Sequence, residues 1–135
     1  MADPSADSPG ALPPAARLRL FLYVCIPVRA AAGGVLLILP PAALPYAGAA
    51  AAAIALGFVS SIARGRAGML THGGFGGKVW WAGWRPVHLA AWATAAGLLF
   101  ARAPPVWPAL VLLGDFLFGA FLGAWHYSTP ASRSA

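Results

Sequence analysis

Charged residues are scarce in this sequence, and acidic residues are almost absent. Charged side chains make up 9% of the 135 residues, and only three residues are Asp or Glu. A soluble domain carries about 25% charged residues, so this chain lacks the polar surface that a water-soluble fold requires. Hydrophobic residues make up 60%, and the mean hydropathy is +0.74. The composition therefore indicates an integral membrane protein.

Cysteine and clustered metal ligands are also missing. The single Cys25 excludes an internal disulfide, and its place in an apolar run favours a packing role. No set of Cys, His and carboxylate residues has zinc spacing, so we expect no metal site. Haem ligation by His88 and His126 would need similar depths, but His88 lies about 15 Å beyond Lys78 and His126 lies near the interface. We expect no cofactor.

Long apolar runs account for most of the chain. They cover about residues 18–39, 46–63, 79–101 and 107–126. Each is close to the roughly 20 residues that cross a hydrocarbon core of ~30 Å, and none alternates as a barrel strand would. The sequence therefore predicts an all-α fold: an integral membrane four-helix bundle with short loops, over residues 17–127.

Both ends of the chain differ from this apolar region. Residues 1–16 are rich in Pro, Ala and Ser and have no apolar period, which predicts a disordered N-terminal tail. A signal peptide would place positive charge directly before an apolar core, whereas the Ala and Arg content leaves an organelle transit peptide open. Residues 128–135 are predicted to form a flexible C-terminal tail.

Basic residues are distributed unevenly along the runs. With four spans, one side of the membrane receives Arg17, Arg19, Arg64, Arg66, Lys78 and Arg133, and the other receives Arg102. The positive-inside bias then places both termini in the cytoplasm, without saying which membrane the protein occupies. Lipid headgroup or interface positions are assigned to Arg64, Arg66, Lys78, Trp80, Trp81 and Trp84. The net charge of +6 suits anionic membrane lipids as partners, and we expect no nucleic-acid binding.

Glycine is concentrated between the second and third runs, in the stretch THGGFGGKVWW at residues 71–81. A phosphate-binding P-loop needs a Gly five positions before its Gly-Lys pair and a Ser or Thr after it. His72 stands at the first of these positions and Val79 at the last, so we reject a P-loop. A pliable interfacial connector and a lid or headgroup-binding loop both stay open.

A few polar residues interrupt the runs, and we interpret Arg29, Asp115, Arg85 and His88 as intramembrane polar residues. Arg29 lies about 15 Å, and Asp115 about 12 Å, from the same outer end of the predicted helices. Opposite charges at one depth predict an Arg29–Asp115 ion pair. Arg85 lies nearer the cytoplasmic side, and if its helix begins at Pro86, Arg85 lies among the lipid headgroups.

Helical spacing places these residues on faces that contain small or aromatic side chains. The faces are Cys25, Arg29 and Gly33; Trp81, Arg85, His88 and Trp92; and Asp115, Gly119, Leu122 and His126. Gly119 and Gly123 form a GxxxG pair, which permits close helix packing. Pro27 is expected to free a carbonyl near Tyr23 and to bend the first helix.

Four short patterns occur together in this chain: CIPVR at 25–29, FGGKVWW at 75–81, RPVH at 85–88 and an Asp in the last helix. In this order they resemble a family of small multi-span membrane proteins of algae, protists and large DNA viruses. The resemblance covers roughly residues 20–127. This chain differs from the family in its Ala-rich second helix and in its longer Pro-rich tail. The family has no assigned activity, so the resemblance implies no mechanism.

Two classes of function remain after these exclusions. A hydrolase would need a nucleophile and a base within reach, but Ser60 and Ser61 have no evident His partner, so we predict no catalytic residues. The sequence favours a structural or assembly component in which the Arg29–Asp115 pair fixes helix register, alone, in a homo-oligomer or with a partner subunit. The alternative is an oligomeric transporter or channel that moves protons, ions or a small anion along the same charges.

Overall fold

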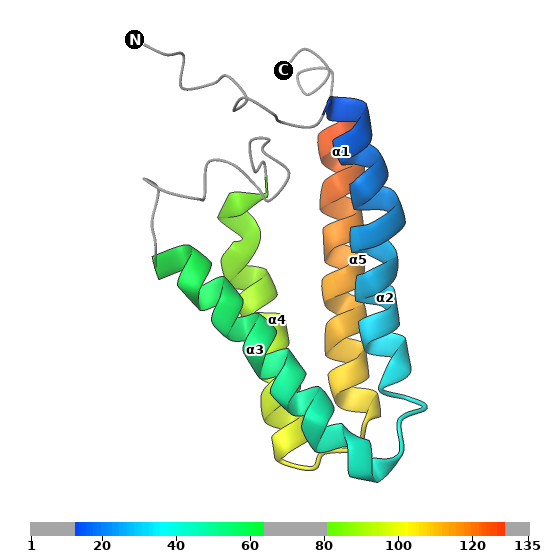
Figure 1. Ribbon diagram of the computed structural model, residues 1–135, viewed down its shortest axis with the longest axis vertical. Coiled ribbons are helices and arrows are strands. Elements are labelled where there is room, and N and C mark those ends of the chain that lie inside the picture. The colour runs from blue at the N-terminus through cyan, green and yellow to red at the C-terminus, as the bar shows by residue number, and fades with distance from the viewer. Residues whose placement is uncertain (1–12, 64–80, 129–135) are drawn as a thin grey trace.

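Helices dominate the described part of the chain, which in this computed structural model covers residues 13–63 and 81–128 (Figure 1). Those residues contain no strand. The first segment runs through α1 (Pro14–Leu20), a π-helical turn (Phe21–Cys25) and α2 (Ile26–Val35). The later segments are α3 (Leu44–Ala63), α4 (Arg85–Phe100) and α5 (Val106–Ser128). Short 3-10 turns, Pro41–Ala43 and Ala82–Trp84, precede α3 and α4.

Within the described residues, three helices are long and apolar enough to cross a membrane. They cover Leu18–Val35, Pro41–Ala63 and Val106–Ser128. The fourth helix, α4, has 16 residues. It is therefore about 24 Å long, short of the core thickness of ~30 Å. Two ionisable residues, Arg85 and His88, occupy its first turn and reduce its apolar length.

The helix bounds differ from those expected, and proline explains part of the difference. The first helix begins at Pro14, before the expected start at residue 18. Proline suits the first helical position because its missing N–H has no partner there. Beyond Val35 the amide of Leu39 donates to the Val35 carbonyl, so one more helical turn follows α2 and ends at the residue before Pro40. The predicted tail residues 1–12 and 129–135, and the glycine-rich residues 64–80, lie outside the described residues.

The π-helical turn in the first helix lies directly before Pro27. The amide of Ile26 bonds to the carbonyl of Phe21, five residues back, which is the π pattern. Pro27 has no N–H to offer the Tyr23 carbonyl, and its ring would clash with that carbonyl in a regular α-helix. The wider turn therefore accommodates the proline at the position where the sequence predicted a disturbance.

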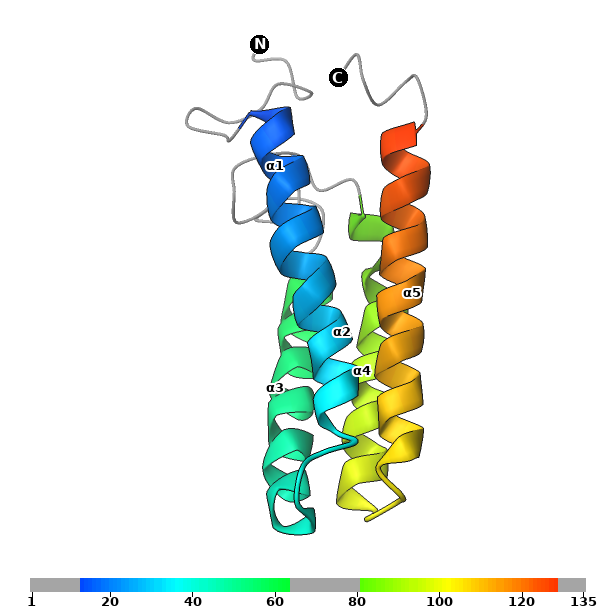
Figure 2. The same ribbon diagram turned by 90° about the vertical axis from the view of Figure 1, so that its right-hand side faces the viewer.

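The helices are arranged as two pairs, α2 with α5 and α3 with α4, and α4 also packs against α5. The pairs lie closest at the end that carries the turns before α3 and α5, and they diverge toward the end where α1 starts and α5 ends (Figure 1). Figure 2 shows the pair α2 and α5 in front of α3 and α4. Small residues permit this packing. A Cβ added at Gly48 of α3 would lie 3.2 Å from Leu99 Cβ, and one added at Gly33 of α2 would lie 2.8 Å from Leu113 Cγ.

The apolar core lies toward the end where the pairs converge. Its buried members are Leu36, Ala95, Leu99, Ala109 and Leu112. Ala95 is fully buried at the centre of α4, where a larger side chain would separate the helices. The polar residues singled out from the sequence lie farther along the bundle, toward the diverging end.

Candidate functional site

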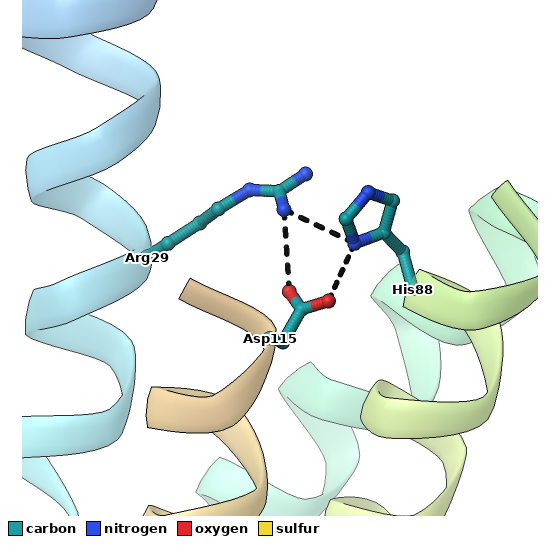
Figure 3. Close-up of polar contacts among 3 residues, drawn as sticks. All are labelled: Arg29, His88 and Asp115. Atoms are coloured by element: carbon teal, nitrogen blue, oxygen red, sulfur yellow. Dashed lines mark hydrogen bonds and ion pairs between the residues drawn. The ribbon is translucent and has the colours of Figure 1, made fainter. Parts of the chain in front are cut away.

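The predicted contact between Arg29 and Asp115 is present in the structure (Figure 3). Arg29 extends from α2, and its Nη1 lies 3.4 Å from Oδ2 of Asp115 on α5. The Asp115 side chain is 1% exposed and the Arg29 side chain 21% exposed. An isolated carboxylate at this depth would be strongly disfavoured, so the guanidinium supplies the counter-charge that the carboxylate requires.

A third residue, His88 of α4, completes the site. Its Nδ1 lies 2.5 Å from Oδ1 of Asp115 and 3.1 Å from Nη1 of Arg29. Two lone pairs at the shorter distance would repel, so one proton lies between Nδ1 and Oδ1. An Arg nitrogen can only donate. Asp115 therefore accepts from Arg29, whereas the tautomer of the His88 ring decides which group donates in its contacts with Asp115 and Arg29. We call Arg29, His88 and Asp115 the Arg–Asp–His cluster.

Glycine makes room for the Arg29 guanidinium on α5. A Cβ added at Gly119, one turn after Asp115, would lie 2.8 Å from Nη1 of Arg29. A Cβ added at Gly123 would collide with the Phe21 ring. The GxxxG pair therefore lies against α2 and the π-helical turn, as its predicted packing role requires. On α2, Arg29 shares the inward face with Gly33, as the spacing of four predicted.

Aromatic rings surround the His88 side chain. The ring centroids of Phe58, Trp81 and Phe118 lie 5.9, 6.2 and 5.8 Å from that of His88. Phe58 belongs to α3 and Phe118 to α5, so side chains from α2, α3 and α5 meet at or beside His88. The residue is 2% exposed. These rings exclude water from the Nδ1–Oδ1 contact, and a low local dielectric strengthens such a contact.

Arg85 is buried, although it lies at the first residue of α4. It is 7% exposed, and its guanidinium carbon lies 5.2 Å from the centroid of the Trp81 ring. The helix begins at Arg85, one residue before the start at Pro86 that the alternative assumed, and the placement of Arg85 among lipid headgroups stays a prediction. Within the described residues, Arg85 Nη1 has no hydrogen-bond partner.

The residues assigned to the lipid interface are only partly described. Trp81 is partly buried, and its ring lies against the Arg85 guanidinium and edge-on to His88. Trp84 is 44% exposed, and its ring packs on Phe118 with centroids 5.5 Å apart. The remaining assignments, Arg64, Arg66, Lys78 and Trp80, lie outside the described residues.

Sequence reasoning identified His88 as a buried polar residue but not as a partner of Asp115. The signal was depth: His88 lies about 18 Å from the end of α4, and Asp115 about 14 Å from the start of α5, at the same end of the bundle. Among the described residues, no group of three or more metal-binding side chains lies close together. The cluster can hold charges and one shared proton, and it joins three helices.

Comparison with known proteins gave no match to a family model, to a curated protein or to a solved structure. The resemblance to the algal, protist and viral family stays a prediction that rests on the four short patterns.

Proposed function

We propose that this protein is a four-span integral membrane protein with a structural or assembly role. In this proposal the Arg–Asp–His cluster fixes the register of α2, α4 and α5. One observation carries the proposal: Asp115 makes polar contacts with groups on two other helices, Arg29 of α2 and His88 of α4. A carboxylate held by groups on two separate elements specifies how those elements are placed.

The charge balance of the cluster supports this role. The positive charge of the Arg29 guanidinium balances the negative charge of the Asp115 carboxylate. A register device needs such a closed set, because a charge left without a partner inside the bundle would cost several kcal/mol, about 3–5 when one member of a pair is removed. Use of buried polar groups to fix register is the best-attested role for them.

Exposed apolar side chains support a membrane location. Large hydrophobic residues exposed by more than half include Tyr23, Ile38, Tyr46, Leu56, Leu117 and Trp125. A surface of this kind fits lipid tails, a second copy of the chain or a partner membrane subunit. The positive-inside bias then orients both termini toward the cytoplasm.

Liposome reconstitution and labelling test the proposal together. The charge-free variant Arg29→Gln/Asp115→Asn should keep most of the thermal stability of the native protein in detergent, and neither protein should carry ion flux above empty liposomes. Single cysteines at Ser8 and Ser132, in a Cys25→Ala background, should resist an impermeant thiol reagent in intact cells. Labelling of either cysteine from outside would contradict the orientation.

A second candidate function is proton passage, and the 2.5 Å contact between His88 Nδ1 and Asp115 Oδ1 favours it. A shared proton between a histidine and a carboxylate is the arrangement that relays use inside membranes. If the cluster relays protons, liposomes that contain the native protein should acidify under an imposed potential, and His88→Gln should abolish that flux. Equal flux in both proteins and in empty liposomes would rule out this function.

A further inference from the structure

A buried positive charge lies outside the Arg–Asp–His cluster, at the start of α4. Arg85 is 7% exposed, and its Nη1 has no hydrogen-bond partner among the described residues. A buried charge without a partner is strongly disfavoured. We propose that Arg85 and the N-terminal end of α4 bind the phosphate group of an anionic ligand.

The described residues offer Arg85 no free counter-ion. Asp115 is the only carboxylate among them, and Arg29 and His88 already occupy both of its oxygens. The sequence holds just two further acidic residues, Asp3 and Asp7, which lie outside the described residues. Arg29 already balances the charge of Asp115, so the positive charge of Arg85 is left for an anion to compensate.

The start of α4 adds a second source of positive potential. Its N-cap residue, Trp84, makes no side-chain cap hydrogen bond, and the first turn holds no acidic residue. The first N–H groups of a helix have no partner within it, and they lie at the positive end of the helix dipole. Pro86 has no N–H, so an anion at this position would be held by the guanidinium and by the positive end of the helix dipole.

The Trp81 ring orients the guanidinium. The guanidinium carbon lies 5.2 Å from the ring centroid, a cation–π distance, so the Arg85 side chain reaches back past the start of its own helix. Helical side chains lean in that direction. Stacking covers one face of the planar group and leaves its N–H edge for a ligand. That edge matches two oxygens of a phosphate better than a single charged point would.

Two sources could supply this phosphate: the headgroup of a membrane lipid and free inorganic phosphate. The start of α4 lies toward the end of the bundle where α1 begins and α5 ends (Figure 1). The shared chemistry is a phosphate anion, and the two sources are separated by experiment.

Thermal unfolding of the purified, delipidated protein in detergent tests the proposal. Inorganic phosphate and a short-chain phosphatidylglycerol are titrated separately into the native protein, Arg85→Met and Arg102→Gln. The control replaces an exposed Arg just beyond the other end of α4. At least one ligand should raise the unfolding temperature of the native protein and of Arg102→Gln. In Arg85→Met the apparent affinity should fall about tenfold or more. A response to the lipid alone identifies a headgroup, and a response to both shows that phosphate suffices.

The stability of each variant without ligand is compared with that of the native protein, so the test still gives an answer if a variant folds poorly. Arg85→Met should then be at least as stable as the native protein, because it removes a buried charge that lacks a partner. Lower stability of Arg85→Met without ligand, together with no response of the native protein to either titration, would overturn the proposal.

Equal affinities in the native protein and Arg85→Met would also overturn the proposal. So would phosphate binding that appears only in Asp3→Asn/Asp7→Asn, since these carboxylates would then be the counter-ions of Arg85. None of these variants alters the Arg–Asp–His cluster, so failure here leaves the proposed function standing.

Discussion

Two regions along the bundle hold its helices together in different ways, and we call them the apolar level and the charged level. Toward the converging end, the apolar core of Leu36, Ala95, Leu99, Ala109 and Leu112 packs small and branched side chains closely. Toward the diverging end, the Arg–Asp–His cluster links α2, α4 and α5 through charges and hydrogen bonds. In lipid, apolar association between helices has little driving force beyond packing, so the first level depends on shape and the second on charge.

This difference predicts how each level responds to substitution. The apolar core should tolerate a substitution that preserves side-chain volume. It should lose stability when a substitution leaves a gap between two helices or adds atoms where their backbones are in close contact. The cluster should tolerate the joint removal of opposite charges and should fail when one charge is left alone. The two levels should therefore be distinguishable by stability measurements on single and paired variants.

The largest expected effect is the loss of the Asp115 carboxylate. Asp115→Asn leaves the partly buried Arg29 charge without its carboxylate and should lower the free energy of unfolding by about 3 kcal/mol, the lower end for a fully buried pair. Thermal or denaturant unfolding in detergent measures this, with Gly114→Ala as the control. A Cβ added at Gly114 meets nothing within 4 Å, so the control should stay close to the native stability. Equal stability of the native protein and Asp115→Asn would contradict the claim that the contacts of Asp115 hold the charged level together.

The two levels differed in how far the sequence alone could predict them. Length and hydropathy predicted the helical fold, and depth along the helices predicted the contact between Arg29 and Asp115. Depth could also have paired His88 with Asp115, but a neutral ring gives no charge signal that requires a partner. The burial of Arg85 could not be read from the sequence, because it depends on Trp81 folding back over the guanidinium. The helix bounds near Pro14 and Arg85 shifted for similar local reasons.

Overfilling the apolar level should have the next largest effect. A Cβ at Gly33 would lie 2.8 Å from Leu113 Cγ and 3.2 Å from the Ala109 carbonyl oxygen, neither of which is the free end of a flexible side chain. Gly33→Ala should therefore cost about 1–3 kcal/mol of unfolding free energy. The neighbouring Gly34 has open space around it, so Gly34→Ala should be neutral or gain about 0.5–1 kcal/mol from helix propensity. Equal effects at the two positions would show that α2 and α5 are not in close contact.

Overfilling the charged level should cost less. A Cβ at Gly119 would lie 2.8 Å from Arg29 Nη1, which is the end of a flexible side chain and can move away. Gly119→Ala should displace the guanidinium from Asp115 and cost about 1 kcal/mol, the net value of one hydrogen bond. In an Arg29→Gln background the same change should cost less, because a shorter side chain stands opposite. A cost that is unchanged by the background would show that Gly119 does not act through Arg29.

The smallest expected effect lies outside both levels, at the end of α4. Arg102 has φ 56°, and its amide bonds to the Leu99 carbonyl while that of Ala103 bonds to the Leu98 carbonyl. This is the helix ending in which glycine is favoured. Arg102→Gly should raise the unfolding free energy by about 0.5–1 kcal/mol. The change removes the strain of a non-glycine residue in the left-handed region, and the greater conformational entropy of glycine in the unfolded chain offsets part of that gain. Arg102→Ala keeps the strain and should show no gain. A gain of equal size in both variants would contradict the assignment to backbone strain.

The central claim is that Asp115 holds the helices through its charge partners, and a double-mutant cycle between Arg29 and Asp115 tests it most directly. Unfolding free energies are measured in detergent for the native protein, Arg29→Gln, Asp115→Asn and the double variant. Asp115→Asn leaves the partly buried Arg29 charge without its carboxylate, and Arg29→Gln leaves the buried Asp115 with His88 as its one partner in the cluster, whereas the double variant removes both charges. The account predicts that the double variant is more stable than additivity allows, by about 2 kcal/mol. Additivity to within about 0.5 kcal/mol would contradict the claim.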